Sequence, residues 1–318
     1  MDKPKALKNR TLTVSAAECE ELKANIIFPE NKALAASAIR NKILCGNLFA
    51  VLDFLPTEFA DLLIIDPPYN LDKNFKGLKF SKTSDDTYLQ YLESWFPRLC
   101  RTLKPGGSVY MCGDWKSTYS LYQIMRDNTI IRNRIIWQRE KGRGAQANWK
   151  NTCEDIWFGT KSNEYYFNVD AVKQKRRVLA PYRENKNPKD WQETPDGNFR
   201  LTHPGNFWDD ISVPYWSMPE NTEHPAQKPE KLIAKLILAS CTPGGLVLDP
   251  FIGSGTTAVA AKKLGRNYTG IEINTEYCCL AEKRLMLAET NPAIQGYSNG
   301  IFWERNTFNL QRRYTEPS

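Results

Sequence analysis

The chain has 318 residues, of which 41% are apolar and 25% are charged, and its formal net charge is +7. This composition is typical of a globular protein with a buried core, and the longest apolar runs are too short to cross a bilayer, which excludes a membrane span. The positive charge favours a polyanionic partner but does not decide it, because a solvated basic surface has the same composition.

The eight cysteines and two histidines predict no metal site. The cysteines lack the paired spacing that closes a zinc site, so we expect reduced, mostly buried thiols and no bound metal. No charged-then-apolar signal segment stands at the start of the chain. We therefore expect a cytoplasmic protein.

The segment from 42 to 137 predicts strands that alternate with helices. The expected elements are strands at 43–45, 61–65, 108–112 and 130–137, and helices at 48–55, 88–103 and 118–126. The helix at 88–103 ends at Lys104-Pro105-Gly106-Gly107, which we interpret as a turn into the next strand. Such alternation is typical of a parallel sheet that is covered by helices.

A polar stretch from about 139 to 223 interrupts this alternation. It is rich in Lys, Arg, Asn, Trp and Tyr, and short strands are expected at 154–158 and 165–167. Regular elements then return: helices at 230–240, from about 255, and at 275–289, and strands at 246–248 and 268–271. We therefore predict one α/β domain, in which a twisted, mostly parallel sheet of about seven strands has helices on both faces and carries a polar insertion.

The stretch 246–257 predicts a ligand site at the end of a strand. A buried strand ends at Asp249, and the small-residue turn Gly253-Ser254-Gly255 leads into a helix whose first N–H groups are free. The next strand ends at Glu272, and an acid at this position of a doubly wound fold accepts hydrogen bonds from ribose hydroxyls. A P-loop is excluded because its lysine-containing pattern is absent, and a dinucleotide site is disfavoured because a third spaced glycine is missing.

The strand at 62–65 ends in the sharpest motif of the chain, Asp66-Pro67-Pro68-Tyr69. Two prolines impose a rigid, extended exit from the strand, which holds Asp66 and Tyr69 at the carboxyl edge of the sheet. Alone, the motif is equally compatible with a rigid turn that closes a strand. Together with the glycine turn, it indicates a reaction site.

These residue types suit the methylation of an exocyclic amine. Such an amine is a poor nucleophile because its lone pair is delocalised into the ring, and two acceptors for its N–H bonds favour a pyramidal nitrogen. Asp66 and the Pro67 carbonyl can be these acceptors, acting through hydrogen bonding and position. Tyr69 can stack on a base that has left the duplex.

The Asp-Pro-Pro-Tyr motif, the glycine turn and a third segment at 224–229 together resemble the β class of DNA amino-methyltransferases, over residues 42 to about 288. In that family the Asp-Pro-Pro-Tyr segment, here at 66–69, precedes a target-recognition region, and the cofactor motif, here at 249–257, comes last. His224-Pro225-Ala226-Gln227-Lys228-Pro229 is similar to the segment that precedes the cofactor strand. The resemblance implies the class I S-adenosylmethionine-dependent methyltransferase fold with a circularly permuted motif order.

The resemblance also divides the chain. It implies an N-terminal extension at 1–40, a catalytic half at 41–170, a target-recognition insertion at 171–223, a cofactor-binding half at 224–290 and a C-terminal tail at 291–318.

S-adenosylmethionine is the cofactor that the resemblance implies. The family usually has an acid where this chain has Asn47, whose side chain can still bond the adenine of the cofactor with its one acceptor atom. The expected cofactor-binding residues are Asn47, Asp66, Lys228, Asp249, Pro250, Phe251, Gly253, Ser254, Gly255, Thr256, Thr257 and Glu272.

Within the family, Asp-Pro-Pro-Tyr mostly accompanies N6 of adenine and Ser-Pro-Pro-Tyr mostly accompanies N4 of cytosine, so the motif favours adenine. N4-cytosine methylation stays open as the alternative. Carbon-5 methylation is disfavoured because no Pro-Cys dipeptide marks its thiolate nucleophile. A relative that methylates RNA, or that binds nucleic acid without catalysis, is the remaining alternative, and the intact Asp66 and Tyr69 argue against catalytic silence.

Cations and aromatic residues of the insertion suit contacts to phosphates and bases, although each one is also compatible with a solvated basic face. The family likeness implies duplex DNA as the partner, with a cognate restriction endonuclease and a homodimer as further partners. The expected DNA-binding residues are Arg139, Lys141, Arg143, Trp149, Lys150, Lys173, Lys175, Arg176 and Arg177.

Overall fold

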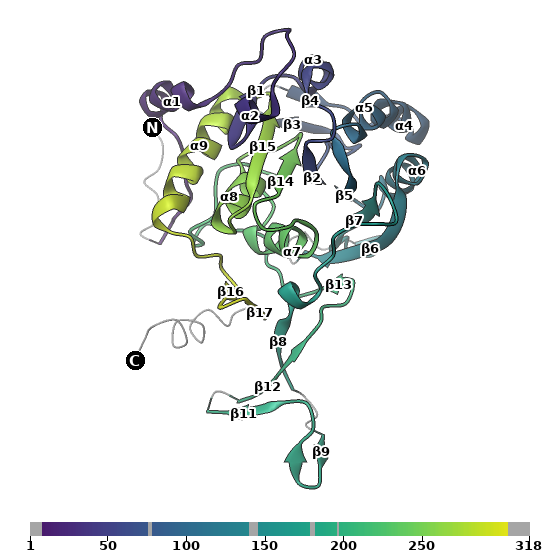
Figure 1. The fold of residues 1–318 in the computed structure, drawn as a ribbon, viewed down its shortest axis with the longest axis vertical. Helices are drawn as coiled ribbons and strands as arrows, with labels where there is room; N and C mark the ends of the chain where they lie inside the picture. Colours follow the sequence, from purple (N-terminus) through teal and green to yellow (C-terminus); the bar gives the residue numbers. More distant parts are fainter. Residues whose placement is uncertain (1–7, 76–77, 140–145, 179–181, 196, 305–318) are drawn as a thin grey trace.

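The computed structural model describes residues 8–304, except for 76–77, 140–145, 179–181 and 196. Figure 1 shows a central sheet with helices on both sides and a narrow β-structure that projects from one end. Among the described residues, no helix is both long and apolar enough to span a membrane.

The central sheet has eight strands in the order β1-β15-β14-β2-β5-β7-β6-β13. Neighbouring strands from β1 to β5 are parallel, whereas β7 runs antiparallel to both β5 and β6. The strands are β1 (Lys42–Cys45), β15 (Asn267–Glu272), β14 (Leu246–Asp249), β2 (Ala60–Ile65), β5 (Leu103–Gly113), β7 (Cys153–Thr160), β6 (Ile130–Gln138) and β13 (Phe207–Trp208). The predicted α/β class, a mostly parallel sheet with helices on both faces, is confirmed, and the two-residue strand β13 is an eighth strand that the sequence analysis did not expect.

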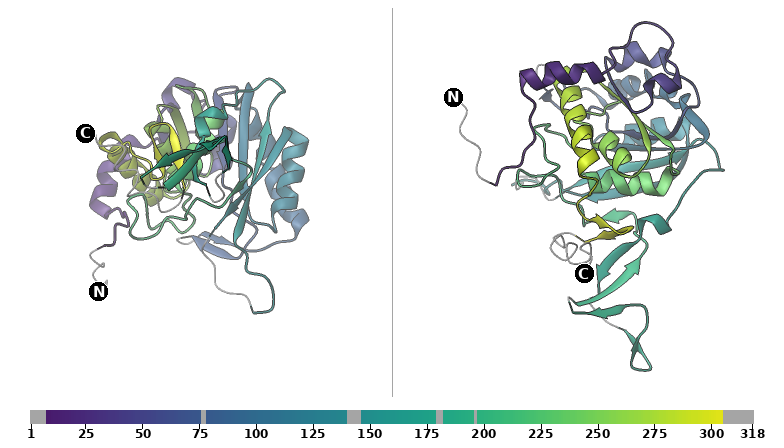
Figure 2. Two further views of the ribbon diagram at one scale, coloured as in Figure 1. Left: turned by 90° about the horizontal axis from the view of Figure 1, so that it is seen from below. Right: turned by 60° about the vertical axis from the view of Figure 1, so that its left-hand side comes forward.

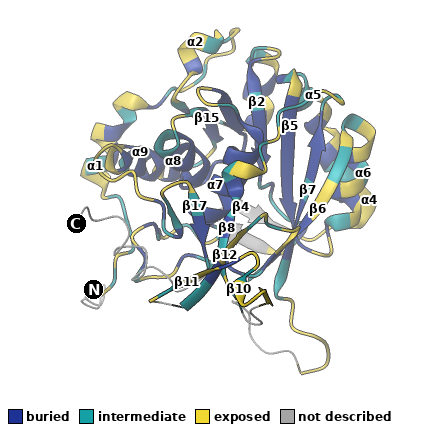
Figure 3. Cartoon of the chain, turned by 60° about the horizontal axis from the view of Figure 1, so that its bottom comes forward, coloured by how far each residue is buried: buried dark blue, intermediate teal, exposed yellow. Residues whose placement is uncertain are grey.

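Alternate residues of each strand face opposite sides of the sheet. Because consecutive residues of the inner strands are apolar, both faces of the sheet are apolar. In β2, Leu62 and Ile64 belong to the core cluster under α7, α8 and α9, whereas Leu63 and Ile65 belong to the cluster under the helices of the other face. The inner strands β14 and β2 are almost wholly buried, whereas β6 is partly exposed (Figure 3). The first face carries α7 (Glu230–Ser240), α8 (Thr256–Lys263), α9 (Thr275–Thr290) and α1 (Ala16–Leu22); the second carries α2 (Ala36–Ile39), α3 (Leu48–Val51), α4 (Asp85–Glu93), α5 (Phe96–Cys100) and α6 (Thr118–Asn128).

The projecting β-structure is built from segments that are far apart in the sequence. A five-stranded sheet has the order β11-β12-β8-β17-β16, and the hairpin β9–β10 lies near its far end in Figures 1 and 2. The strands of the five-stranded sheet are β8 (Gln174–Arg177), β11 (Gln192–Thr194), β12 (Gly197–Thr202), β16 (Tyr297–Ser298) and β17 (Ile301–Trp303), and those of the hairpin are β9 (Arg183–Glu184) and β10 (Asn187–Pro188). Residues 297–303, which the sequence analysis assigned to the C-terminal tail, therefore complete the sheet that begins in the insertion.

Short elements connect the larger ones. The hairpin of β3 (Lys73–Phe75) and β4 (Leu78–Phe80) follows the Asp66 motif, and three 3₁₀ helices cover η1 (Lys23–Asn25), η2 (Leu52–Phe54) and η3 (Asp170–Val172).

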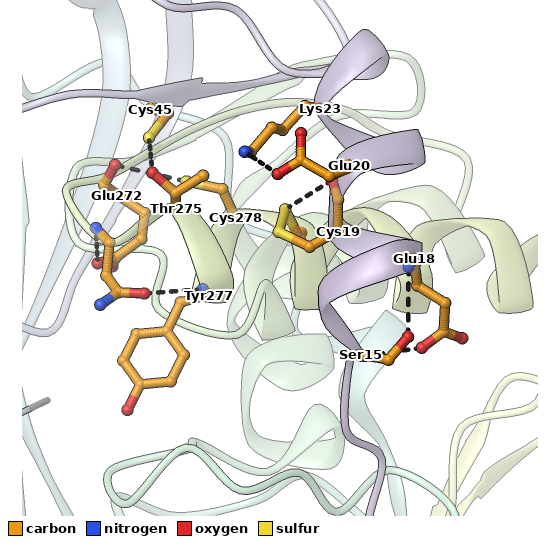
Figure 4. Close-up of a disulfide and its surroundings, with 12 residues drawn as sticks. Ser15, Glu18, Cys19, Glu20, Lys23, Cys45, Glu272, Thr275, Tyr277 and Cys278 are labelled. Atoms are coloured by element: carbon orange, nitrogen blue, oxygen red, sulfur yellow. Dashed lines mark hydrogen bonds and ion pairs between the residues drawn. A yellow bond between two sulfur atoms is a disulfide. The ribbon is translucent and has the colours of Figure 1, made fainter.

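The N-terminal segment packs against the end of the cofactor half. Ser15 caps α1 with a capping box, and Cys19 of α1 forms a disulfide with Cys279 of α9 (Figure 4). The expectation that the cysteines are all reduced is therefore wrong for this pair. Sequence spacing could not indicate it, because 260 residues separate the two cysteines.

Four predicted elements differ from the structure. The helix expected at 48–55 is the short helix α3 followed by the 3₁₀ helix η2. The single helix expected at 88–103 is two helices, α4 and α5, because Pro97 is at the start of α5 and cannot continue the hydrogen bonding of α4. The turn expected at 104–107 lies within β5, which begins at Leu103. The strand expected at 165–167 is absent, and those residues form an irregular segment.

The glycine turn offers a test of the fold. Gly255 has φ +85°, and a Cβ there would lie 2.6 Å from the Ala281 Cβ, whereas Gly244 has φ +73° in open space. Gly244→Ala should cost only the backbone strain, ~1 kcal/mol, and Gly255→Ala should destabilise the chain by at least ~2 kcal/mol more because α9 is packed behind it. Urea unfolding measures both, and equal losses would contradict the close packing of α9 on the turn.

Candidate active site

A cleft lies at the carboxyl edge of the sheet, where the motifs of both halves of the chain meet. Its walls come from the ends of β2, β6, β14 and β15 and from the segment before α7. The lining residues are Asp66, Pro67, Pro68, Tyr69, Trp137, Arg139, Glu154, Val213, His224, Pro225, Ala226, Gln227, Lys228, Phe251, Gly253, Glu272, Ile273, Asn274 and Tyr277.

Asp66 is held by two donors from different segments. Lys228 Nζ lies 2.5 Å from Asp66 Oδ2, and the Tyr69 hydroxyl donates to Asp66 Oδ1 at 2.8 Å. The Lys228 ammonium also lies 5.5 Å from the centroid of the Tyr69 ring. Each carboxylate oxygen therefore has a fixed neighbour, and the carboxylate has a defined orientation in the cleft.

Glu154 is a second carboxylate in the same network, and the sequence analysis missed it. It is only 3% exposed, forms an ion pair with Arg139, accepts a hydrogen bond from the Tyr69 hydroxyl at 3.3 Å and lies 3.6 Å from Lys228 Nζ. β7 is antiparallel to β5, so its first residues, not its last, reach the carboxyl edge. The sequence did show an acid at the start of a buried strand. Assigning that acid to the site, however, required knowledge of the direction of the strand in the sheet.

The network keeps its donors protonated. Burial alone would lower the pKa of Lys228, but the charges of Asp66 and Glu154 outweigh it and the pKa is raised. Burial, followed by the same two carboxylates, raises the pKa of Tyr69 well above its ordinary value. Lys228 is therefore a cation and Tyr69 a neutral phenol at neutral pH, so neither is suited to act as a general base.

The rigid exit from β2 is supported from α4. The Tyr88 hydroxyl donates to the Pro68 carbonyl at 3.0 Å, and the Asn70 side chain bonds the backbone of Thr83 in both directions. Tyr88 is 5% exposed, so this support comes from inside the core. The chain after Asp66 is thus fixed by two prolines and by hydrogen bonds to the segment that begins α4.

Two acids, the buried Asp249 and the half-buried Glu272, belong to the glycine-turn side of the cleft. Asp249 accepts from the Thr257 hydroxyl at 2.6 Å and from the Phe251 N–H at 2.9 Å, and Glu272 accepts from the N–H groups of Asn274 at 2.8 Å and Gly253 at 3.1 Å. Burial is the main cause that raises the pKa of Asp249 to about 7 and that of Glu272 to about 7. Both carboxylates therefore change charge near neutral pH and organise the turn through backbone hydrogen bonds.

The structure brings most of the predicted cofactor residues together. Asp66, Lys228, Phe251, Gly253 and Glu272 line the cleft. A small adjoining cavity is lined by further predicted residues, namely Asp249, Ser254, Thr256 and Thr257.

Three predicted cofactor residues are not part of these linings. Pro250 is buried and Gly255 makes the left-handed turn into α8. Asn47 is exposed and caps α3, where its side chain accepts from the Phe49 N–H at 3.0 Å. Asn47 stands two residues after the end of β1, at the same sheet edge as Glu272, because Cys45 pairs with Glu272 in register.

The described members of the predicted DNA-binding set lie on two separate parts of the chain. Arg139 lines the cleft, and Trp149 and Lys150 are exposed near it in the chain, Trp149 by 94%. Lys141 and Arg143 lie outside the described residues.

The second basic group, on and just before β8, is largely engaged within the protein. Lys173 pairs with Asp170, Lys175 lies 4.4 Å from the centroid of the Trp303 ring, and Arg176 pairs with Asp209 and Glu304. Arg177 donates its backbone N–H to Glu304. Carboxylates thus already neutralise Arg176.

The sequence pattern of a DNA methylase family that covers N6 and N4 enzymes matches residues 60–283, which include every motif that lines the cleft. The chain belongs to this DNA methylase family. It is an S-adenosylmethionine-dependent DNA methyltransferase, and its cleft is the candidate active site.

Curated relatives match most of this methyltransferase. DNA adenine methyltransferase YhdJ from Escherichia coli (strain K12) is 36% identical over 279 residues, which are 85% of this chain and 90% of that protein. Type II methyltransferase M.HpaI from Haemophilus parainfluenzae is 33% identical over 247 residues, 77% of this chain and 74% of that protein.

Solved structures share the fold. A complex of M1.HpyAVI with S-adenosylmethionine has a TM-score of 0.50 and 25% identity, and it covers 76% of this chain and 98% of its own. The cytosine-N4-specific PvuII DNA methyltransferase has a TM-score of 0.57 at 18% identity and covers 76% and 85%, which supports the fold alone.

The raised pKa of Glu272 predicts a pH dependence of stability. Its folded pKa of about 7 lies above the ordinary value of 4.5, so the folded protein binds the extra proton and loses stability as pH rises from about 4.5 to 7. The free energy of unfolding of Glu272→Gln should therefore rise, relative to that of the unsubstituted chain, by roughly 1–3 kcal/mol between pH 5 and pH 8.

Urea unfolding at the two pH values measures this gain. Glu289→Gln is the matched control, because Lys262 lowers the pKa of that exposed carboxyl and the gain should not appear. A pH-independent difference for Glu272→Gln would show that Glu272 ionises normally in the folded chain.

Proposed function

We propose that the chain methylates N6 of adenine in duplex DNA, with Asp66, Pro67, Pro68 and Tyr69 as the catalytic residues. Its main support is the position of Asp66, an acceptor that is fixed by Lys228 and Tyr69 and that shares one cleft with the glycine-turn residues. An aspartate at the start of the motif and the similarity to an adenine methyltransferase favour adenine over cytosine.

The donor set fits S-adenosylmethionine. When bound, the cofactor supplies a methyl group on a cationic sulfur, which is open to attack by a nitrogen lone pair. Glu272, at the end of β15, would accept from the ribose hydroxyls as a carboxylate. The turn after Asp249 would bring backbone N–H groups close to the cofactor, and Phe251 and Lys228 would close the cleft around it.

In the reaction, the residues of the protein would orient the amine and stabilise the charge that develops on it. A base that enters the cleft would place its amine where Asp66 and the Pro67 carbonyl accept the two N–H bonds, so that the nitrogen lone pair is directed away from them. After transfer, the nitrogen carries a positive charge and loses one proton to Asp66. Lys228 cannot take this proton because it is already protonated.

Tyr69 has to rearrange for this reaction. Its hydroxyl donates to the Asp66 oxygen that an amine would use, so an incoming base must displace the hydroxyl or share the oxygen with it. Glu154 lies 3.3 Å from the hydroxyl and can keep it hydrogen-bonded after displacement. The freed ring can then stack on the base, which has lost its stacking in the duplex.

Labelled methyl transfer tests this proposal. The full chain, duplex DNA and S-adenosylmethionine with a labelled methyl group should give labelled DNA, and digestion to nucleosides should place the label on N6-methyladenine. Label on N4-methylcytosine would overturn the adenine assignment in favour of the alternative amine. Label on structured RNA in preference to duplex DNA would overturn the choice of polymer.

Asp66→Asn should lower kcat by about 10³-fold, because the amide presents one acceptor atom where the carboxylate has two and lacks the charge that stabilises the developing cation. Asp114→Asn is a matched control: Asp114 also follows a central strand, but its carboxylate is buried and accepts from the Ser117 N–H at 2.9 Å. Single-turnover rates measure both variants. If both lose activity equally, Asp66 has no special place in the chemistry.

The DNA contacts belong to the same proposal. We infer that the segment 171–223 and the exposed Trp149 and Lys150 contact the duplex outside the cleft, and that Arg139 acts inside it. A cognate restriction endonuclease and a homodimer stay predictions of the sequence analysis.

A further inference from the structure

We propose that Arg284, on α9, is a positioning residue that holds the cofactor turn and ties it to the segment carrying Lys228. This inference rests on the proposed function, because it assigns to the turn the cofactor of the reaction. Arg284 is far from the motifs in the sequence and is only 3% exposed.

The guanidinium group of Arg284 reaches the turn from behind. Nη1 donates to the Ser254 carbonyl at 2.9 Å and to the Thr256 hydroxyl at 3.0 Å. Both acceptors lie in the turn whose neighbouring atoms line the small cavity beside the cleft. The Gly255 N–H belongs to the same peptide as the Ser254 carbonyl and donates to the Ile252 carbonyl at 2.9 Å, so both polar groups of this peptide have fixed partners.

The backbone of α9 supports the same turn. A Cβ on Gly255 would lie 2.6 Å from the Cβ and 2.9 Å from the Cα of Ala281, so the turn and the helix are in direct contact. Ala281 and Arg284 are three residues apart and lie on one face of α9. One helix face thus provides both the surface on which the turn rests and the donors that hold it.

The other side of the guanidinium group binds α7. Nη2 donates to Glu230 Oε1 at 2.9 Å, and Glu230 is the first residue of α7, two positions after Lys228. Lys228 in turn contacts Asp66. Arg284 therefore connects the glycine turn, through Glu230 and the start of α7, to the residue that fixes the catalytic carboxylate.

Both ends of this connection need a forked cation. A lysine has one ammonium group and cannot bond the Ser254 carbonyl, the Thr256 hydroxyl and Glu230 in the geometry of the planar guanidinium. Glu230 is also neutralised by Lys263, whose Nζ lies 2.8 Å from Oε2. Lys263 donates its other hydrogen bond to the Ala293 carbonyl, away from the turn. Both Arg284 and Lys263 neutralise Glu230, but only Arg284 also contacts the turn. Comparing substitutions of the two residues therefore distinguishes support of the turn from neutralisation of Glu230.

Steady-state kinetics of the full chain tests the inference. Arg284→Met should raise KM for S-adenosylmethionine by about tenfold and lower kcat, while KM for DNA stays within about twofold, because charged hydrogen bonds to the turn are lost and the DNA-facing wall is unchanged. Arg284→Lys should fall between the unsubstituted chain and Arg284→Met. Lys263→Met should keep KM for the cofactor near the unsubstituted value.

Thermal unfolding distinguishes positioning from general loss of stability. Both Met variants leave a buried charge on Glu230 with one partner fewer, so both should lower Tm, and only Arg284→Met should change the cofactor KM. If Lys263→Met raises KM equally, or if Arg284→Met leaves it unchanged, the inference is overturned. If Arg284→Met does not fold, Arg284→Lys is judged alone, and an unchanged cofactor KM in that variant overturns the inference.

The failure of the inference differs from failure of the proposed function. A chain that binds no S-adenosylmethionine in a direct titration, before any substitution, would refute the proposed function. A chain that binds the cofactor, and whose binding is weakened by Glu272→Gln but not by the Arg284 variants, would refute only the positioning role.

Discussion

The ion pair between Lys228 and Asp66 is the contact on which the arrangement of the cleft depends. It joins a strand end in the first half of the chain to the segment before α7 in the second half, 162 residues away. Both side chains are largely buried, so the loss of either partner would leave a largely buried charge in the cleft with one partner fewer. Glu154 completes the group, and the pKa shifts show that Lys228 and Tyr69 remain proton donors within it.

The sheet explains how distant segments reach this contact. Parallel strands end at one edge, so Asp66, Asp249 and Glu272 come together although about two thirds of the chain separates the first from the last. β7 runs the other way and adds Glu154 from its beginning. The helices of the two faces then fix the strand ends from behind, as Tyr88 does for the Pro68 carbonyl and Arg284 does for the turn at Ser254.

The sequence allowed the fold class and the cleft residues at the ends of parallel strands to be predicted, because a buried strand followed by an acid or a rigid turn has a local signature. It did not indicate Glu154 as a site residue, since that assignment needs the direction of β7. It did not indicate Arg284, because a cation on an amphipathic helix is ordinarily solvated, and its burial against Ser254 and Glu230 follows from long-range packing. The pairing of Cys19 with Cys279, and the joining of residues 297–303 to the sheet that begins at β8, are likewise long-range contacts without local signals.

The most direct test of the central claim is an experimental structure of the full chain with S-adenosylmethionine bound. The claim that one cleft unites both halves of the chemistry predicts the cofactor against the Gly253 turn and Glu272, with its methyl group facing the Asp66 carboxylate across the space for one amine. A cofactor bound elsewhere, or bound with its methyl group directed away from Asp66 and Pro67, would contradict it.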